Sequence, residues 1–298
     1  EGIITRAHAK GGRVHIWAWG DQARHWTPVG VGGINGAPDK RLQRYVAARL
    51  GPVPGWSMGY GFDLHEWTKT SQTKEWASYL HQHFGWQHLL CARGQNDSNF
   101  DLNSYDGFGR NVPLKSTSHG PKDYDEIVED LDGDKNRPHI YEERHSYLRG
   151  GFNLTMDGTR RLVWWETMAG GMGGWFGYYH PSVSAYKKHP YPNPEQLRTA
   201  RDFWKGRFLL SMTRDNGITN GYCLRDSEKK HYVFYGEDVN SIRMNLSAMN
   251  GSQPAVAVDC KKAYAEINLG TLATKDKIWN APYSSDWAIA VGDFSSTS

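Results

Sequence analysis

Short apolar runs alternate with longer amphipathic segments over the first two thirds of the chain. The short runs are typical of buried strands, and the longer segments place apolar residues every three or four positions, which is the period of a helix. Short strands alternating with helices of about ten residues predict βαβ units and a parallel sheet. The predicted strands are 13–20, 55–63, 88–93, 100–105, 137–145 and 173–179, and the predicted helices are 1–10, 39–49, 76–84, 124–131, 159–168 and 194–210.

Several end signals support these boundaries. Gly11-Gly12 is a helix terminator, Asp39 is predicted to cap the helix that follows it, and Asp157 is predicted to cap the helix at 159–168. The count is six βα units, whereas a closed (β/α)8 barrel of the TIM type needs eight.

The pattern changes near Asp215. From there the chain contains only short alternating segments separated by turn signals such as Asn250-Gly251, which predicts an antiparallel β-sandwich of roughly 80 residues. We therefore expect an α/β barrel domain at 1–214 and a sandwich domain at 215–298. The predicted sandwich strands are 222–224, 231–235, 241–246, 255–258, 262–267 and 287–291.

Composition narrows the range of functions. The 35 basic and 32 acidic residues give a net charge of +3, too weak a balance to indicate nucleic acid. There is no apolar stretch of about 18 residues, so we expect no membrane span. Three scattered cysteines without a CxxC pair indicate neither a zinc ribbon nor a disulfide framework, and one disulfide, such as Cys223–Cys260, stays open. The 13 Trp and 16 Tyr suit the apolar faces and hydroxyls of sugars, although most such residues are core.

Candidate chemistry lies where the predicted strands end, because functional side chains gather at the carboxyl face of a parallel barrel. Asp63 follows a glycine-rich strand, and Glu142 and Glu143 end another. Two carboxyl groups on separate strands are what glycoside hydrolysis requires. Adjacent strand residues face opposite sides, so only one of the two glutamates faces the cleft. Asp63 also fits a helix N-cap before residues 64–67.

Aromatic and polar side chains at the same predicted strand ends are candidates for substrate binding. The aromatic ones would form a platform for sugar rings, and the others would hold hydroxyls or an acidic substituent. These candidates are Trp17, Trp19, Trp67, Arg93, Tyr105, Arg144, His145, Trp175 and Tyr178.

Two segments resemble apiosidase-like glycoside hydrolases. Residues 137–147, RPHIYEERHSY, are similar to the seventh strand of these (β/α)8 enzymes, and 159–177, TRRLVWWETMAGGMGGWFG, to the following helix and eighth strand. In that family a collagen-binding-like β-sandwich often follows the barrel, and residues 231–235 and 282–291 resemble it weakly. The resemblance extends over nearly the whole chain.

The resemblance implies a retaining mechanism without a cofactor, with Asp63 as acid/base and Glu142 as nucleophile. Glu143 is the alternative nucleophile if the alignment slips by one, and Glu66 is a rival acid because the fourth-strand motif departs from the family pattern. It also implies that residues 14–20 are strand three. Strands one and two would then be absent from this chain, and another chain or a preceding segment would complete the barrel.

Three functions are compatible with the sequence. The first is a glycosidase acting on a polysaccharide or oligosaccharide, which we expect to be secreted or periplasmic and to bind neither nucleic acid nor membrane. The second is a non-catalytic carbohydrate-binding protein on a degenerate barrel. The third is a metal-dependent hydrolase using Asp63 with His15, His139 or His145, although no metal-binding motif such as HExxH supports it.

Overall fold

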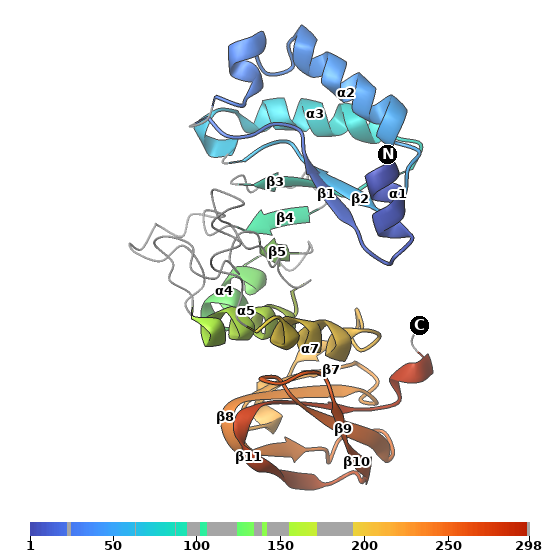
Figure 1. The fold of residues 1–298 in the computed structure, drawn as a ribbon, viewed down its shortest axis with the longest axis vertical. Helices are drawn as coiled ribbons and strands as arrows, with labels where there is room; N and C mark the ends of the chain where they lie inside the picture. The colour runs from blue at the N-terminus through green and yellow to red at the C-terminus, as the bar shows by residue number, and fades with distance from the viewer. Residues whose placement is uncertain are drawn as a thin grey trace. The chain divides into compact units, whose positions relative to one another are not determined.

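The structure is a computed structural model that describes residues 1–22, 25–62, 64–86, 88–93, 102–105, 124–133, 139–141, 155–171 and 193–296. Its contacts divide the chain into two compact units (Figure 1). Unit 1 contains Glu1–Pro121 and Asp134–Arg144, and unit 2 contains Lys122–Gly133 and His145–Ser298. Compact units and domains need not coincide, so the domain boundary at 214/215 stays a prediction.

Unit 1 is built on a parallel sheet, as the alternating pattern predicted. Its five strands follow one another in the order β1-β2-β3-β4-β5 (Figure 1). The strands are β1 (Val14–Trp17), β2 (Trp56–Gly59), β3 (Leu90–Arg93), β4 (Leu102–Tyr105) and β5 (His139–Tyr141). The helices are α1 (Gly2–His8), α2 (Ala37–Leu50) and α3 (Thr70–His83), with short 3-10 turns η1 (Pro28–Val31) and η2 (Leu64–Glu66).

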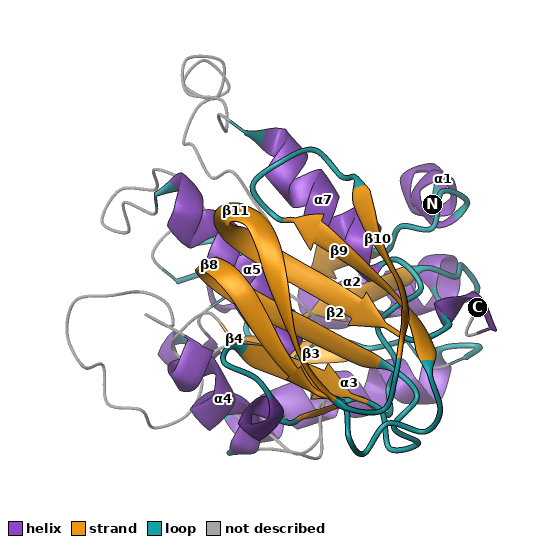
Figure 2. Cartoon of the chain, turned by 90° about the horizontal axis from the view of Figure 1, so that it is seen from below, coloured by secondary structure: helices purple, strands orange, loops and turns teal. Residues whose placement is uncertain are grey.

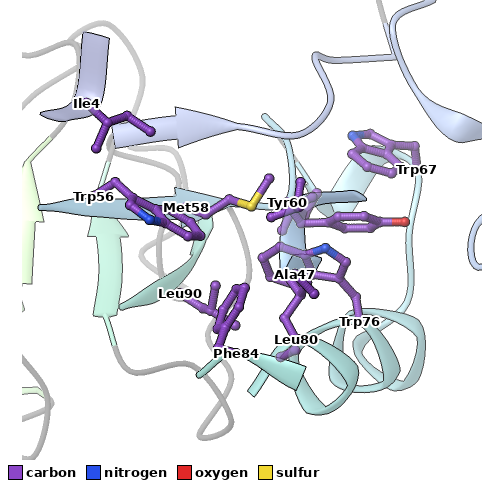
Figure 3. Close-up of a cluster of buried hydrophobic side chains, with 13 residues drawn as sticks. Ile4, Ala47, Trp56, Met58, Tyr60, Trp67, Trp76, Leu80, Phe84 and Leu90 are labelled. Atoms are coloured by element: carbon purple, nitrogen blue, oxygen red, sulfur yellow. The ribbon is translucent and has the colours of Figure 1, made fainter. Parts of the chain in front are cut away.

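The core of unit 1 lies between one face of the sheet and helices α2 and α3. Trp56 and Met58 of β2 are buried in it against Trp76 and Leu80 of α3 (Figure 3). These strand positions are even-numbered, and Val14 and Ile16 of β1 pack on the same cluster. Because strand side chains alternate between faces, the odd-numbered positions of β1 and β2 belong to the opposite face of the sheet.

Unit 2 combines helices with an antiparallel sheet of six strands in the order β10-β9-β11-β8-β7-β6. The strands are β6 (Thr213–Arg214), β7 (Tyr222–Arg225), β8 (Tyr232–Asn245), β9 (Gln253–Asp259), β10 (Glu266–Leu272) and β11 (Asp276–Val291). The helices are α4 (Tyr124–Asp132), α5 (Met156–Met168) and α7 (Pro194–Trp204), with 3-10 turns η3 (Asn216–Ile218) and η4 (Phe294–Ser296).

The long strands β8 and β11 pair along most of their length (Figure 2). The β8–β11 register shifts at residues 280–287, where β-bulges bend a strand. Ile242 and Met244 at one end of β8 share a core cluster with Phe234 near its other end and with Ile289 of β11. The six strands thus form one hydrogen-bonded antiparallel sheet with a common core, as the alternating pattern after Asp215 predicted, whereas the β-sandwich stays a prediction.

Helix α5 packs within unit 2 through both apolar and charged contacts. The Trp164 ring stacks on Tyr235 of β8 at a centroid distance of 5.1 Å and an interplanar angle of 5°. The Arg160 Nη2 lies 2.6 Å from Asp286 Oδ2, and both side chains are essentially inaccessible to solvent. Residues 232–235 are all buried, because both faces of this part of the sheet are covered.

Several boundary predictions were wrong. Asp39 lies inside α2, whose N-cap is Gly36, and Thr155 caps α5 while Asp157 pairs with Arg160. Helix α7 ends at Trp204, so Leu210, predicted on its apolar face, is 98% exposed.

The predicted strands at 231–235 and 241–246 are one strand, β8, and β11 begins at Asp276 instead of residue 287. The strand predicted at 262–267 begins only at Glu266. The parts of these strands that face solvent are polar, so the sequence pattern there indicates a strand only weakly.

The Cys223–Cys260 disulfide is absent. All three cysteines are free and buried. Cys223 lies on β7 and Cys260 directly follows β9, and the strands β8 and β11 separate β7 from β9 in the sheet. Burial raises the pKa of both thiols. No helix among the described residues is long and apolar enough to cross a membrane.

Candidate active site

The parallel register of unit 1 brings the carboxyl ends of its strands to one edge of the sheet. The five strands end at Trp17, Gly59, Arg93, Tyr105 and Tyr141. The segment that follows each strand at this edge is where an α/β barrel carries its functional side chains. The predicted catalytic residues follow β2 and β5 in the sequence, so the edge of unit 1 formed by these strand ends is the candidate site.

Trp17 lies across the end of β2. A Cβ atom added at Gly59 would come within 2.0 Å of the Trp17 ring, so only glycine fits beneath this indole. The Trp17 ring also contacts Phe62 at a centroid distance of 4.6 Å and the edge of His15 at 4.7 Å. Trp17 therefore sits in a defined position on the face of the sheet opposite to α2 and α3.

Trp67 occupies a similar seat over Gly61, where an added Cβ would lie 2.5 Å from its ring. Its Nε1 donates to the Phe62 carbonyl at 2.7 Å, and Tyr60 lies between Trp67 and Trp76 (Figure 3). Trp67 is only 8% exposed, so most of its surface is closed to a ligand. Gly59 at the end of β2 and Gly61 just beyond it thus accommodate indole rings, rather than leaving open space for a sugar.

A buried carboxylate holds Trp19. Asp39 of α2 is 1% exposed and accepts hydrogen bonds from Trp19 Nε1 at 2.8 Å and Tyr60 Oη at 2.5 Å. The Asn35 backbone N–H donates to it at 2.9 Å and Gln43 Nε2 at 3.2 Å. Four donors around one carboxylate satisfy a charge that would otherwise be costly to bury. Burial and the hydrogen bond to Asp39 raise the pKa of Tyr60, so its phenol stays protonated as the donor.

His15 is the one metal-ligand candidate whose side chain the structure describes. Burial lowers its pKa to about 4, so the imidazole is neutral at pH 7. Its Nδ1 lies 2.8 Å from Ser57 Oγ on β2, and its Nε2 lies 3.4 Å from Cys91 Sγ on β3. Among the described residues no group of three His, Cys, Asp or Glu side chains is placed to hold a metal ion.

Seven of the predicted site residues lie outside the described residues. They are Asp63, Glu142, Glu143, Arg144, His145, Trp175 and Tyr178, and the alternative metal ligands His139 and His145 are not described as side chains either. Arg93 and Tyr105 are placed by their backbone alone, as the last residues of β3 and β4. The rival acid Glu66 is exposed and ends the 3-10 turn η2.

Two residues at this edge were not predicted from the sequence. Asp39 was interpreted as a helix cap, although it is the acceptor that orients Trp19. Trp26 follows β1 and is 64% exposed. The rule that selected aromatic residues after strand ends would have found Trp26 had it been applied to the whole loop at 20–27.

No protein-family model and no curated protein matches this chain. Among solved structures, a glycoside hydrolase family 5 protein from Bacteroides vulgatus ATCC 8482 aligns with a TM-score of 0.71 at 16% identity, over 99% of this chain and 75% of its own. A protein described as a glycoside hydrolase aligns with a TM-score of 0.70 at 17% identity, over 99% and 77%. A GH30 endoxylanase from Clostridium papyrosolvens C71 gives 0.55 at 11% identity, over 97% and 82%. The chain thus shares its mixed α/β fold with glycoside hydrolases.

Proposed function

We propose that this chain is a glycoside hydrolase that cleaves a polysaccharide or oligosaccharide with two carboxyl groups, Asp63 as acid/base and Glu142 as nucleophile. The observation that carries the proposal is the register of the parallel sheet in unit 1, which relates the end of β5, directly before Glu142, to the face of the sheet that carries Trp17. The fold shared with glycoside hydrolases supports the same reaction class.

The register links the strands residue by residue. Residues paired directly across neighbouring strands belong to the same face of a sheet, and every second residue along a strand returns to that face. One row of paired positions begins at Trp17, whose ring lies on the face away from α2 and α3. This row consists of Trp17, Gly59, Cys91 and Leu102. Ser104 is two residues beyond Leu102 on β4, so it belongs to the same face, and it pairs with Ile140 of β5.

Counting along the strands then separates the two glutamates. Asp63 is four positions beyond Gly59, and Glu142 is two positions beyond Ile140. If the alternation of β5 continues to Glu142, this residue belongs to the face that carries Trp17 and Glu143 belongs to the opposite face. Strand β2 ends at Gly59, and the Phe62 ring, three positions further on, contacts Trp17, so the role of Asp63 rests on the resemblance rather than on counting along β2. The register therefore favours Glu142 over Glu143 as the catalytic residue, an alternative that the sequence left open.

Curvature of the sheet is a requirement of this proposal. Strands β2 and β5 are three steps apart in the sheet, which in a flat sheet separates them by about 14 Å at ~4.8 Å per step. A retaining glycosidase needs its two carboxyl groups about 5–5.5 Å apart. Closing the sheet into a TIM-type barrel brings side chains of its inner face together across the interior. We therefore propose that the parallel sheet belongs to such a barrel.

The chemistry follows from these roles. Protonated Asp63 donates its proton to the glycosidic oxygen while the Glu142 carboxylate attacks the anomeric carbon, which forms a glycosyl–enzyme ester and releases the leaving group. Ionised Asp63 then removes a proton from water, whose oxygen attacks the anomeric carbon and releases Glu142. Both steps pass through an oxocarbenium-like transition state.

The substrate-binding predictions also belong to this proposal. Trp17 and Trp19 hold defined positions at the carboxyl edge, where their rings are suited to the apolar faces of sugars. Arg93, Tyr105, Arg144, His145, Trp175 and Tyr178 would hold hydroxyl groups or extend the aromatic platform. The resemblance to apiosidase-like enzymes favours an uncommon sugar, which a broad substrate panel would reveal.

Hydrolysis of a polysaccharide panel tests the proposal directly. Arabinoxylan, xyloglucan, galactomannan, arabinan and rhamnogalacturonan are each incubated with the protein, and new reducing ends are measured. Glu142→Gln should abolish activity, and Asp63→Asn should lower it by about 10²- to 10⁴-fold. Glu143→Gln is the matched control, because the same chemical change on the opposite face should leave most of the activity. NMR of the first-formed product should show the anomer of the substrate bond.

The opposite results would point to the other functions. Full loss in Glu143→Gln with activity kept in Glu142→Gln would refute the register argument. Binding without hydrolysis by the native chain would indicate a carbohydrate-binding protein, and loss of hydrolysis on treatment with EDTA would indicate a metal-dependent hydrolase.

A further inference from the structure

Trp26 is an exposed aromatic residue held in a closely bonded loop. Its N–H donates to the Asp21 carbonyl at 3.2 Å, and its carbonyl accepts from the Gly20 N–H at 2.7 Å. A Cβ atom at Gly20 would lie 2.7 Å from Trp26 Cβ, so glycine is needed where the loop closes. The preceding His25 has a φ of 55°, in the left-handed region that costs a non-glycine residue energy. The backbone of Trp26 is thus fixed by its neighbours.

The Trp26 side chain is not packed in the core. Thr27 and Pro28, which follow, are buried, but Trp26 is 64% exposed. Val29 and Val31 are about half exposed, which adds apolar surface beside the ring. A fixed loop that leaves a large flat ring in solvent gains little stability from it. This arrangement is suited to a ring that binds a ligand.

The loop is connected to the proposed active site by backbone hydrogen bonds. The carbonyl of Gly20 accepts from Phe62 N–H at 2.9 Å, while the N–H of the same Gly20 donates to Trp26. Phe62 immediately precedes Asp63 in the sequence. Two hydrogen bonds therefore separate the backbone of Trp26 from that of the residue before the proposed acid/base, so a glycan bound at Asp63 would pass close to Trp26.

We propose that Trp26 is a stacking platform for a sugar residue of the bound glycan, next to the sugars that flank the cleaved bond. This inference rests on the proposed function and extends it to a further binding subsite. The apolar face of a sugar ring packs on an indole, and the exposed imidazole of His25 beside it can bond to a hydroxyl group. A protein partner fits less well, because a stable interface needs about 800 Å² on each side, far more than Trp26, Val29 and Val31 offer.

The test compares Trp26→Ala with a control tryptophan. Trp86 is 52% exposed and precedes β3, so it lies toward the amino ends of the strands, away from the proposed site. Binding is measured by affinity electrophoresis in gels that contain arabinoxylan, xyloglucan, galactomannan, arabinan or rhamnogalacturonan. Trp26→Ala should weaken the retardation by about three- to tenfold in the gel that retards the native chain. Trp26→Phe should restore most of it, and Trp86→Ala should match the native chain.

Several outcomes would overturn the subsite. They are unchanged retardation of Trp26→Ala, an equal loss in Trp86→Ala, or no retardation of the native chain in any gel. A dimer of the native chain that Trp26→Ala dissociates, measured by sedimentation, would make a second copy the occupant instead. Hydrolysis is measured separately with the same variants. Trp26-dependent binding without hydrolysis would refute the proposed catalysis and support the glycan subsite. Hydrolysis that Trp26→Ala leaves unchanged, together with unchanged binding, would support the catalysis and refute the subsite.

Discussion

The buried carboxylate of Asp286 allows a sharp test of what holds unit 2 together. Its side chain is fully buried and accepts hydrogen bonds from Arg160 Nε and Nη2 at 3.1 and 2.6 Å, from Arg161 Nε at 3.2 Å, and from the Asp238 N–H at 2.9 Å. Asp286→Asn keeps the shape but removes the charge and turns one acceptor into a donor facing the arginines. Arg160, which is also buried, would then keep Asp157 and Gln196 as its hydrogen-bond partners among the residues that the structure describes.

The expected loss of stability is large because the buried Arg160 cannot move its charge into water without disturbing α5. Removing one partner of a buried ion pair costs about 3–5 kcal/mol, a substantial part of the 5–15 kcal/mol typical of a folded protein. The midpoint of thermal unfolding should fall by roughly 6–20 °C. Asp276→Asn is the control, since its pair with Arg243 has both side chains nearly half exposed. Solvent screens the charges of such an exposed pair, so its loss should change the stability far less.

The assay is urea unfolding followed by tryptophan fluorescence and far-UV circular dichroism, at pH 7 and at a series of lower pH values. Burial favours the neutral form of Asp286, but hydrogen bonds from Arg161, the Asp238 N–H and Arg160 outweigh it and hold the pKa below its usual value. A lowered folded-state pKa contributes stability above the unfolded value of about 3.9, and that contribution is lost as the pH falls. The gap between native chain and variant should therefore narrow below about pH 4.

Equal losses of unfolding free energy in Asp286→Asn and Asp276→Asn would refute the role of the buried ion pair. So would a gap between Asp286→Asn and the native chain that stays constant down to pH 2, because the carboxylate would then not be the source of the stability.

Three further predictions concern single residues. Burial lowers the pKa of His15 to about 4 in the folded chain, so between pH 6.5 and 4 only the unfolded chain binds a proton at this residue. The free energy of unfolding should therefore decrease by about 3 kcal/mol as the pH falls through this range. His15→Gln should remove this pH dependence in urea titrations. Gly59→Ala should displace Trp17 and lower the thermal midpoint, whereas Gly85→Ala, with open space at its Cβ, should leave it unchanged. Leu210→Ala should change the unfolding free energy by less than about 0.5 kcal/mol, because Leu210 is 98% exposed, while Leu246→Ala at a fully buried site should cost about 2–5 kcal/mol in the same denaturant assay.

Element types along the chain were predictable because each depends on local periodicity. The alternation of apolar runs and amphipathic segments gave the five parallel strands and most helices of the described region. Ends were less predictable where a polar side chain had more than one use. Aspartate is a common helix cap, and from the sequence a capping Asp39 cannot be told from one that accepts hydrogen bonds from Trp19 and Tyr60, because these donors lie far away in the chain.

The sequence predicted which residues follow the strand ends as catalytic candidates, but it did not show which of them share a face of the sheet. The ends of β2 and β5 precede Asp63 and Glu142 as the strand pattern required, yet the choice between Glu142 and Glu143 depends on a register that runs through four strand pairings. Register is a property of neighbouring strands and is invisible in either strand alone.

The sequence by itself therefore determined the classes of element, the parallel and antiparallel regions and a short set of strand-end residues, because these depend on spacing within one segment. Only the tertiary structure decided which glycines lie against an indole ring, that Asp39 accepts a hydrogen bond from Trp19, and that Trp26 stays exposed to solvent. Each of these depends on a contact between residues from separate elements, and such contacts are set by packing and register rather than by local pattern.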